Sequence, residues 1–131
     1  MGEGSHSRFR VMGSSNQIGA RAEDLVAEWL TTRRIPIVAR NLRLGALELD
    51  IVARQEDLIL VIEVRTRGKG AWTSGLASIT PAKRKRVREA GQRLWDRRYR
   101  NDSSAERMRF DVAVVDFEST PPRIEYIAAA F

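Results

Sequence analysis

The sequence predicts an α/β fold with a central mixed sheet of about five strands flanked by helices. Two segments repeat apolar residues at the period of a helix, and five shorter segments are rich in β-branched and aromatic residues. The longer helix lies between two strand segments, and such a connection is expected to pair those strands in parallel. A length of 131 residues with 43% hydrophobic residues fits one folded core.

The first helix follows a polar N-terminal segment. Residues 1–15 carry Gly, Ser and charged side chains without a sustained period, which predicts a flexible tail and places the single folded domain at 16–131. Ser15 or Asn16 can cap the helix, which is expected to end before residues 31–34. Its apolar stripe consists of Ile18, Ala22, Leu25, Val26, Trp29 and Leu30.

Three strand segments come next. Residues 35–39 are rich in β-branched side chains and have a proline near the start, which suits the beginning of a strand. Residues 47–53 and 58–64 are separated by four polar residues and predict an antiparallel hairpin. The second arm is apolar on both faces, so we expect it at the centre of the sheet with a helix covering each side.

A glycine-rich segment and a long helix separate this hairpin from the last strands. Residues 66–78 contain three glycines and predict a mobile loop. Thr80 is a suitable N-cap and Pro81 a suitable first-turn residue for the long helix. Two strands are then expected at 110–115 and 124–127.

Composition excludes several kinds of site. The chain has no cysteine and one histidine, which excludes disulfides, thiolate or multi-histidine metal sites and a cysteine nucleophile. No run approaches the ~18 consecutive apolar residues of a membrane helix, and the N-terminus lacks the pattern of a secretion signal. We therefore expect a cytoplasmic protein without a membrane partner, in which any metal is held by carboxylates.

Positive charge is concentrated in the long helix. The chain has 23 Lys and Arg against 17 Asp and Glu, a net charge of +6. Residues 83–100 alone hold nine basic and two acidic side chains, so the rest of the chain is close to neutral. One basic block of this kind is typical of a surface that faces the phosphates of a nucleic acid. A solvated helix face is the alternative.

Carboxylates occupy positions where core strands are usually apolar. Because side chains alternate along a strand, Glu48 and Asp50 share one face of the first hairpin arm, and Glu63 shares one face of the second arm with Arg65. A two-residue turn places Asp50 opposite Glu63, whereas a four-residue loop places Asp50 opposite Val61 and diagonal to Glu63. Either register brings the two carboxylates together.

Two clustered carboxylates at the end of an apolar strand require a cation or raised pKa values. A divalent metal meets this need, since Mg²⁺ binds through one or two carboxylates, retains waters and binds substrate phosphate. Glu23, at the edge of the first helix's stripe, can point at such a metal or face water. The alternative is an ordinary pair of strand-end carboxylates neutralised by Arg65 or Arg43.

This combination of residues resembles the PD-(D/E)xK nuclease superfamily, and more closely the YraN-like family of bacterial proteins, which is related to archaeal Holliday-junction resolvases. The hairpin carries Glu48-Leu-Asp50 on one arm and Val61-Ile-Glu63-Val-Arg65-Thr-Arg67 on the other. The resemblance extends from about residue 19 to the C-terminus. It also includes Gly19-Ala-Arg-Ala-Glu23, Asn41-Leu-Arg43, Thr80-Pro-Ala-Lys83, Arg109-Phe-Asp-Val112 and Ala130-Phe131.

The resemblance implies a restriction-endonuclease-like core and a metal-dependent endonuclease that acts on DNA, branched or otherwise structured. It implies that Glu23, Asp50 and Glu63 hold Mg²⁺ (or Mn²⁺), with the carbonyl of Val64 as a further ligand. The resemblance to resolvases also suggests a homodimer. For contact with the nucleic-acid backbone we select the basic residues of the loop and the long helix, namely Arg67, Lys69, Lys83, Arg86, Arg93 and Arg97.

The family's catalytic lysine falls on Arg65 in this sequence. A lysine amine can shift its pKa and help to deprotonate water, whereas arginine remains charged and can only orient water or stabilise negative charge. The catalytic residues expected are therefore Glu23, Asp50, Glu63 and Arg65. The alternatives are a non-catalytic nucleic-acid-binding module that retains the nuclease fold and, more weakly, a domain whose arginines bind an acidic protein.

Overall fold

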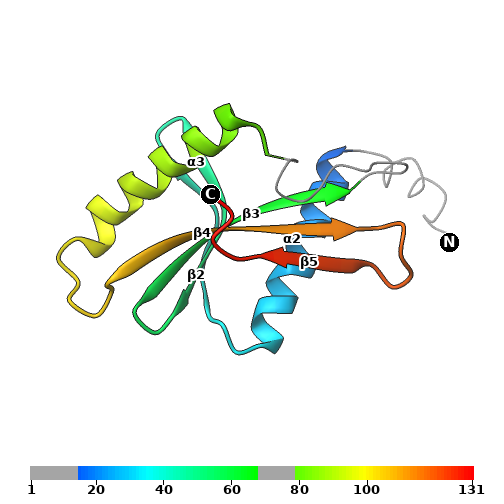
Figure 1. The fold of residues 1–131 in the computed structure, drawn as a ribbon, viewed down its shortest axis with the longest axis horizontal. Helices are drawn as coiled ribbons and strands as arrows, with labels where there is room; N and C mark the ends of the chain where they lie inside the picture. Colours follow the sequence, from blue (N-terminus) through cyan, green and yellow to red (C-terminus); the bar gives the residue numbers. More distant parts are fainter. Residues whose placement is uncertain (1–14, 68–78) are drawn as a thin grey trace, which may run out of the picture.

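A five-stranded sheet forms the centre of the protein in a computed structural model that describes residues 15–67 and 79–131 (Figure 1). The strand order is β1-β2-β3-β4-β5, and β3 and β4 are parallel whereas all other neighbours are antiparallel. The α/β class and the mixed sheet predicted from the sequence are thus confirmed. The strands are β1 (Ile37–Leu44), β2 (Leu47–Gln55), β3 (Leu58–Arg67), β4 (Arg107–Asp116) and β5 (Arg123–Ile127).

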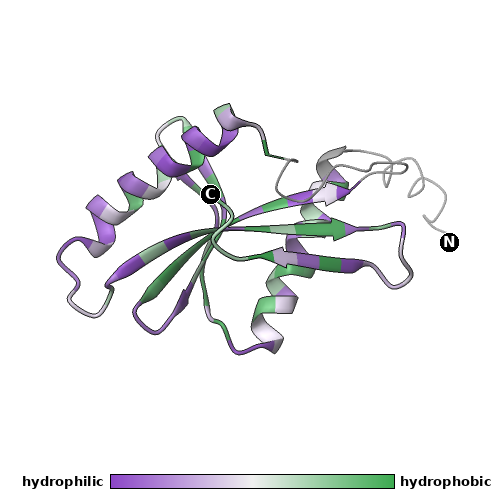
Figure 2. Ribbon diagram, viewed as in Figure 1, coloured by the Kyte–Doolittle hydropathy of each residue, from purple (hydrophilic) through white to green (hydrophobic). Residues whose placement is uncertain are grey.

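Helices cover both faces of this sheet (Figure 1). Helix α2 (Ser15–Thr32) packs on one face, and α3 (Pro81–Leu94) packs on the other and continues into one π-helical turn, η2 (Trp95–Tyr99). Strand β3 contributes to both layers, because Leu60 and Ile62 pack with α2 while Ile59 and Val61 pack with α3. Figure 2 shows green on the central strands and mixed colours on the helices, as expected for a doubly covered strand.

The β2–β3 hairpin has the tighter of the two registers considered above. Gln55 pairs with Leu58 and Ile51 pairs with Ile62, so the turn consists of Glu56 and Asp57 alone. The backbone of Glu56 has a φ of 57°, which is the left-handed conformation such a turn requires. The ladder ends at Ile51, and the next residue on each arm is an acid, Asp50 on β2 and Glu63 on β3.

Several element boundaries differ from those expected. Strand β1 continues to Leu44 rather than 39, because a two-residue turn at Gly45, with a φ of 68°, connects it directly to β2. Strand β4 begins at Arg107 rather than 110, since its full length pairs with β3. The tail was expected at 1–15, but Ser15 already belongs to α2. Residues 1–14 and most of the expected loop, including Lys69, lie outside the described residues.

Helix α3 begins where the sequence predicts. The Thr80 hydroxyl accepts a hydrogen bond from the Lys83 backbone N–H at 3.1 Å, and Pro81 is the first helical residue. This cap fixes the first turn of α3 beside the end of β3 and so determines where the Lys83 side chain emerges. No helix in residues 15–67 or 79–131 is long and apolar enough to span a membrane.

Candidate functional site

A polar hollow of about 290 Å³ lies at the carboxyl end of β3, between the second and third turns of α2 and the first turn of α3. Both helices, β2 and β3 contribute to its wall, so the hollow exists only in the folded protein. It contains all the predicted metal ligands and the predicted catalytic Arg65. The lining residues are Gly19, Ala22, Glu23, Asp50, Glu63, Val64, Arg65, Thr66 and Lys83.

Glu63 is the most buried acidic residue of the hollow, with 1% of its surface exposed. Its Oε1 atom lies 3.2 Å from Nζ of Lys83. Its Oε2 atom is buried and has no hydrogen-bond partner within the described part of the chain. A buried carboxylate oxygen without a donor is unfavourable, so this atom has the capacity for a further ligand.

Asp50 lies beside Glu63 and interrupts the sheet. Its Oδ2 atom accepts a hydrogen bond of 2.9 Å from the backbone N–H of Val64. The carboxylate is thus held by the backbone of β3, just beyond the last β2–β3 pair at Ile51 and Ile62. Asp50 and Glu63 are therefore fixed by adjacent positions of one strand, which confirms the proximity expected from the alternation of side chains.

The pKa values of the acids show how strongly this environment acts on them. Burial, followed by the negative charge of Asp50, raises the pKa of Glu63 to about 8, although Lys83 opposes the shift. Burial also raises the pKa of Asp50, against the Val64 N–H and the charge of Lys83. A divalent cation would favour the ionised forms of both acids.

Glu23 projects into the hollow from α2. Its pKa is raised by burial and then by the charge of Asp50, while a hydrogen bond from Asn41 and the charge of Arg40 lower it. The Arg40 guanidinium lies 4.0 Å from Glu23 Oε1 and 2.7 Å from Asp24 Oδ1. Asn41 adopts a φ of 50°, a conformation that asparagine tolerates better than most residues. Asn41 thus positions Glu23, a role that sequence reasoning missed.

Lys83 occupies a different place from the one that we expected. We assigned it to the nucleic-acid surface of the long helix, but its ammonium group contacts Glu63 and its side chain is only 33% exposed. The hollow therefore has a lysine from α3 as well as Arg65 from β3. The contact depends on how α3 docks onto the sheet, and the sequence carries no local signal for that.

The other predicted nucleic-acid contacts divide into two groups. Arg67 is paired with Glu125 at 2.8 Å, and Arg93 donates a hydrogen bond of 3.1 Å to the carbonyl of Leu44, where it supports the β1–β2 turn. Arg86 and Arg97 are exposed on α3 and η2. Of these predicted contacts, only Arg86 and Arg97 can offer their guanidinium ends to a partner without breaking a contact that the structure describes.

The donor chemistry of the hollow fits a hard divalent cation. Among residues 15–67 and 79–131, no three acidic or histidine side chains already converge as a metal-binding group. Mg²⁺ does not require three, because it commonly binds through one or two carboxylates and retains several waters. Asp50 and Glu63 offer oxygen atoms for this purpose, and Oε2 of Glu63 is buried without a hydrogen-bond partner among the described residues.

Comparison with known proteins places this site in a family. The model of "Uncharacterised protein family UPF0102" matches residues 22–115, which include all five charged residues that line the hollow. The chain belongs to the UPF0102 family. This confirms the resemblance to YraN-like proteins at the level of the family.

UPF0102 proteins from distant bacteria are similar to this chain over nearly its whole length. A UPF0102 protein of Sorangium cellulosum is 50% identical over 115 residues, which cover 87% of this chain and 80% of the relative. One from Geobacter sulfurreducens is 35% identical over 132 residues, covering 100% and 95% of the two chains. One from Rhodococcus jostii is 33% identical over 123 residues, covering 92% and 100%.

Proposed function

We propose that this UPF0102 protein is a metal-dependent endonuclease that hydrolyses phosphodiester bonds in DNA, with Mg²⁺ or Mn²⁺ as cofactor. The observation that carries the proposal is Glu63, a buried carboxylate with one oxygen beside Lys83 and the other without a partner. Burial of such a group costs stability, and residues with this kind of environment are frequent at functional sites. The motif resemblance to PD-(D/E)xK nucleases and the basic long helix support the same function.

The acids of the hollow would hold the metal and its waters. Asp50 and Glu63 provide the carboxylate oxygens, the carbonyl of Val64 a further ligand, and Glu23 an acceptor for a water molecule on the α2 side. A bound Mg²⁺ supplies Lewis acidity toward the phosphate and lowers the pKa of a water nucleophile. The hydrogen bond from the Val64 N–H would keep the Asp50 carboxylate in one orientation while the metal is bound.

Lys83 and Arg65 would stabilise the charge of the reacting phosphate. Lys83 already faces Glu63, and its ammonium can turn its remaining N–H groups toward a phosphate oxygen in the hollow. Arg65 lines the same hollow and contributes a permanent positive charge. The site thus contains a lysine although the strand motif has an arginine, so the departure from the family pattern at Arg65 is compatible with turnover.

DNA of branched or otherwise structured form is the proposed substrate, on the strength of the resemblance to Holliday-junction resolvases. Arg86 and Arg97 on α3 and η2 would hold the phosphate backbone. Two copies of the chain would cut the two strands of a junction symmetrically.

The proposal is tested by cleavage of labelled four-way-junction, flap, single-stranded and duplex DNA with Mg²⁺ or Mn²⁺. A Glu63→Ala variant purified in parallel controls for contaminating nuclease. We expect metal-dependent cleavage by the parent and none by Glu63→Ala, with DNA binding largely retained because the backbone contacts lie elsewhere. Equal cleavage by both proteins, or none by either, would reject the proposal.

A non-catalytic nucleic-acid-binding module is the second candidate. The Lys83–Glu63 ion pair favours it, because a structural pair of this kind can neutralise the carboxylate without a metal. In that case DNA binding falls steeply with salt, is unaffected by Mg²⁺ and is never followed by cleavage.

A further inference from the structure

A second hollow, of about 450 Å³, lies between α3 and the first half of β4, away from the carboxylates. Trp95, Met108 and Phe110, all half-buried, form its apolar part. Arg88 and Arg107, both exposed, line it from α3 and from β4. Strand β5 pairs with β4 only from Val112 onward, which leaves this half of β4 uncovered by β5. We call these five residues the α3–β4 groove.

The backbone around the groove keeps its aromatic side chains in place. Trp95 is the first residue of the π-helical turn, in which the Arg100 N–H bonds to the Trp95 carbonyl at 2.8 Å. The Phe110 ring stacks on Phe131 with centroids 5.6 Å apart, and Arg88 lies over Phe131 at 5.6 Å. π-helical turns are rare and often occur at functional sites. The Phe110 ring of the groove is thus packed on Phe131, and Arg88 lies over that neighbouring ring.

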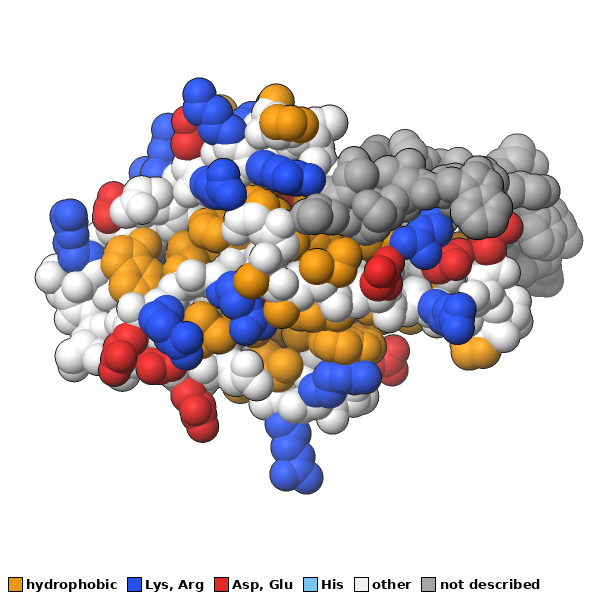
Figure 3. Space-filling model, viewed as in Figure 1, with side chains coloured by type: hydrophobic (Ala, Val, Ile, Leu, Met, Phe, Trp, Pro, Cys, Tyr) orange, Lys and Arg blue, Asp and Glu red, His pale blue; other side chains and the backbone are white. Residues whose placement is uncertain are grey.

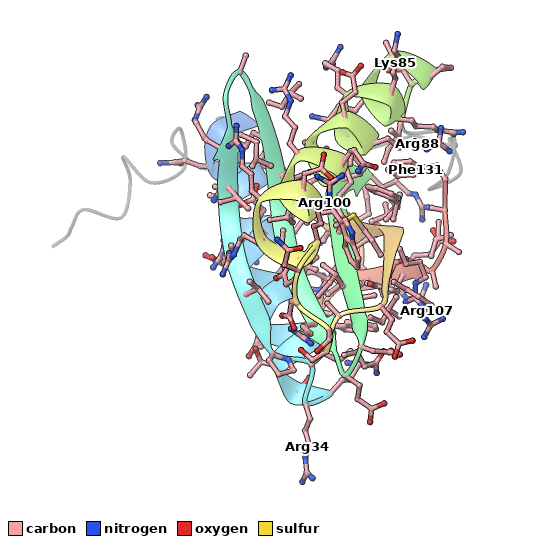
Figure 4. All side chains as sticks on the ribbon, turned by 90° about the vertical axis from the view of Figure 1, so that its left-hand side faces the viewer. Arg34, Lys85, Arg88, Arg100, Arg107 and Phe131 are labelled. Atoms are coloured by element: carbon pink, nitrogen blue, oxygen red, sulfur yellow. The ribbon has the colours of Figure 1, made fainter. Side chains whose placement is uncertain are left out.

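Charge on both sides distinguishes the groove from an ordinary gap in the core. Figure 3 shows exposed apolar side chains on one face of the molecule, with both basic and acidic side chains around them. Figure 4 shows Arg88, Phe131 and Arg107 on the same side of the molecule. Glu106 is the single acidic residue of the described lining, and Arg107 is 66% exposed with only a loose contact of 3.5 Å to Asp57.

We propose that the α3–β4 groove binds unpaired nucleotides of the substrate, with a base against Trp95 and phosphates at Arg88 and Arg107. Proteins hold single strands through aromatic rings that contact bases and basic side chains that follow the backbone. A duplex presents phosphates alone to such a surface and gains nothing from the apolar part. The inference rests on the proposed function, since it takes the substrate to be nucleic acid.

The position of the groove relative to the carboxylates fits a strand that continues from one to the other. Lys83 lies in the first turn of α3 beside Glu63, and Trp95 directly follows the last residue of α3. Twelve helical residues span ~18 Å, which is the length of about five stacked nucleotides at the B-form spacing. The α3 surface between them carries basic side chains along its length, so the strand remains near positive charge throughout.

The test is binding of a fluorescein-labelled 20-mer of thymidylate and of a 20-base-pair duplex, measured by fluorescence anisotropy in EDTA. Trp95→Leu keeps an apolar side chain and removes the aromatic face. We expect it to weaken single-strand binding by about fivefold or more and duplex binding by less than about twofold. Equal losses on both ligands, no loss on the single strand, or no single-strand binding by the parent would overturn the proposal.

A second pair of variants keeps the test valid if Trp95→Leu does not fold. Arg107→Gln removes one groove cation, and Arg34→Gln removes an exposed arginine at the far end of the molecule (Figure 4). Arg107→Gln should weaken single-strand binding more than Arg34→Gln does, and equal effects would overturn the proposal. So would stronger binding of a poly-glutamate peptide than of DNA by the parent, which would assign the groove to an acidic protein.

These outcomes are independent of cleavage. Single-strand binding that depends on Trp95 without any cutting would reject the nuclease and retain the groove. Metal-dependent cutting without an effect of Trp95→Leu on binding would retain the nuclease and reject the groove.

Discussion

Glu63 and Asp111 are the two charged residues buried within the described fold, and their surroundings differ. Asp111 accepts two hydrogen bonds from Arg109, one from the Tyr126 hydroxyl and one from the Ala129 N–H. Every lone pair that burial removes from water has a donor, so Asp111 ties β4 to the C-terminal segment. Glu63 has one cation and an unpartnered oxygen. Asp111 is therefore a structural carboxylate. Burial of Glu63 lowers the stability of the protein, as is expected of a residue that is kept for function.

The first prediction concerns the pH dependence of stability without metal. The pKa of Glu63 is about 8 in the folded protein, and its ordinary value is 4.5. Between pH 4.5 and about pH 8 the folded state therefore binds one proton more than the unfolded state does at this residue. Its stabilising contribution is full below pH 4.5 and is lost as pH rises through about 8. Glu63→Gln lacks this titration and should melt several degrees above the parent at pH 9, a difference on the order of a few kcal/mol.

Thermal melting of both proteins from pH 5 to pH 9 in EDTA checks this prediction. Added Mg²⁺ should raise the melting temperature of the parent at pH 9 more than that of Glu63→Gln, because only the parent retains both carboxylate ligands, Asp50 and Glu63. Parallel pH profiles for the two proteins would show that Glu63 does not titrate in this range.

The second prediction concerns Lys83. Lys83→Met should lower the single-turnover cleavage rate by about 100-fold or more, because it removes a cation placed at the reacting phosphate. DNA affinity should change by less than about threefold, since one phosphate contact is a small part of the total. Lys85→Met, two residues along at an exposed position, is the matched control (Figure 4). Similar rates for the two variants would place Lys83 on the binding surface instead.

Sequence patterns predict part of this site. The proximity of Asp50 and Glu63 follows from side-chain alternation in a hairpin, so it is local information. The contact of Lys83 with Glu63 and that of Asn41 with Glu23 were not predicted, because the first depends on the docking of α3 and the second on a residue of left-handed backbone within β1. Both contacts depend on the packing of elements that are distant in the sequence, and the periodicity of one sequence does not predict such packing.

Among the elements, α3 has one end that the sequence predicts and one end that it does not. Its start at Thr80 and Pro81 is a local capping signal that the sequence shows. Its change to a π-helical turn at Trp95 has no such signal, since the packing of Trp95 and Tyr99 against the sheet determines it. The same holds for β1, whose extension to Leu44 follows from pairing with β2 rather than from its own composition.

The third prediction concerns the contact between α3 and β4. A Cβ atom at Gly91 would lie 2.7 Å from two ring carbons of Phe110 and 3.2 Å from the Met108 sulfur. Gly91→Ala should therefore destabilise the protein by about 1–3 kcal/mol, even though alanine is the better helix former by about 1 kcal/mol. Chemical denaturation measures the free energy of unfolding.

Gly19→Ala in α2 is the matched control. Within residues 15–67 and 79–131, no atom outside the local backbone of α2 lies within 4 Å of the Cβ that it would add. Helix propensity alone should therefore act, and stability should be unchanged or rise by up to about 1 kcal/mol. Equal changes for the two variants would show that α3 does not approach β4 as closely as described.

At the scale of the whole molecule, the basic surface and the acidic site occupy different places. The acids gather at the carboxyl end of β3, whereas exposed basic residues follow α3 outward from that end, as Lys85, Arg88 and Arg100 show in Figure 4. The sequence predicted this basic block, because it is continuous along one helix. Its orientation relative to the hollow required the parallel β3–β4 crossover, which places the start of α3 at the site.

The fourth prediction concerns the salt dependence of DNA binding. The logarithm of affinity should fall linearly with the logarithm of salt concentration, and Arg86→Gln or Arg97→Gln should each reduce the slope by about one. Arg34→Gln, at the far end of the molecule, should leave the slope unchanged. Anisotropy titrations at several salt concentrations measure it, and an effect of Arg34 equal to that of Arg97 would show that α3 is not the DNA-binding face.

The most direct test of the central claim is cleavage of one labelled four-way junction by the parent and by Glu63→Gln, with Mg²⁺ and with EDTA. Glu63→Gln preserves the shape of the side chain and removes its charge, so a loss of activity reports on ligand chemistry rather than on folding. The account predicts cleavage by the parent in Mg²⁺ alone and a loss of at least about 1,000-fold in Glu63→Gln. Cleavage by Glu63→Gln at the rate of the parent, or by the parent in EDTA, would contradict it.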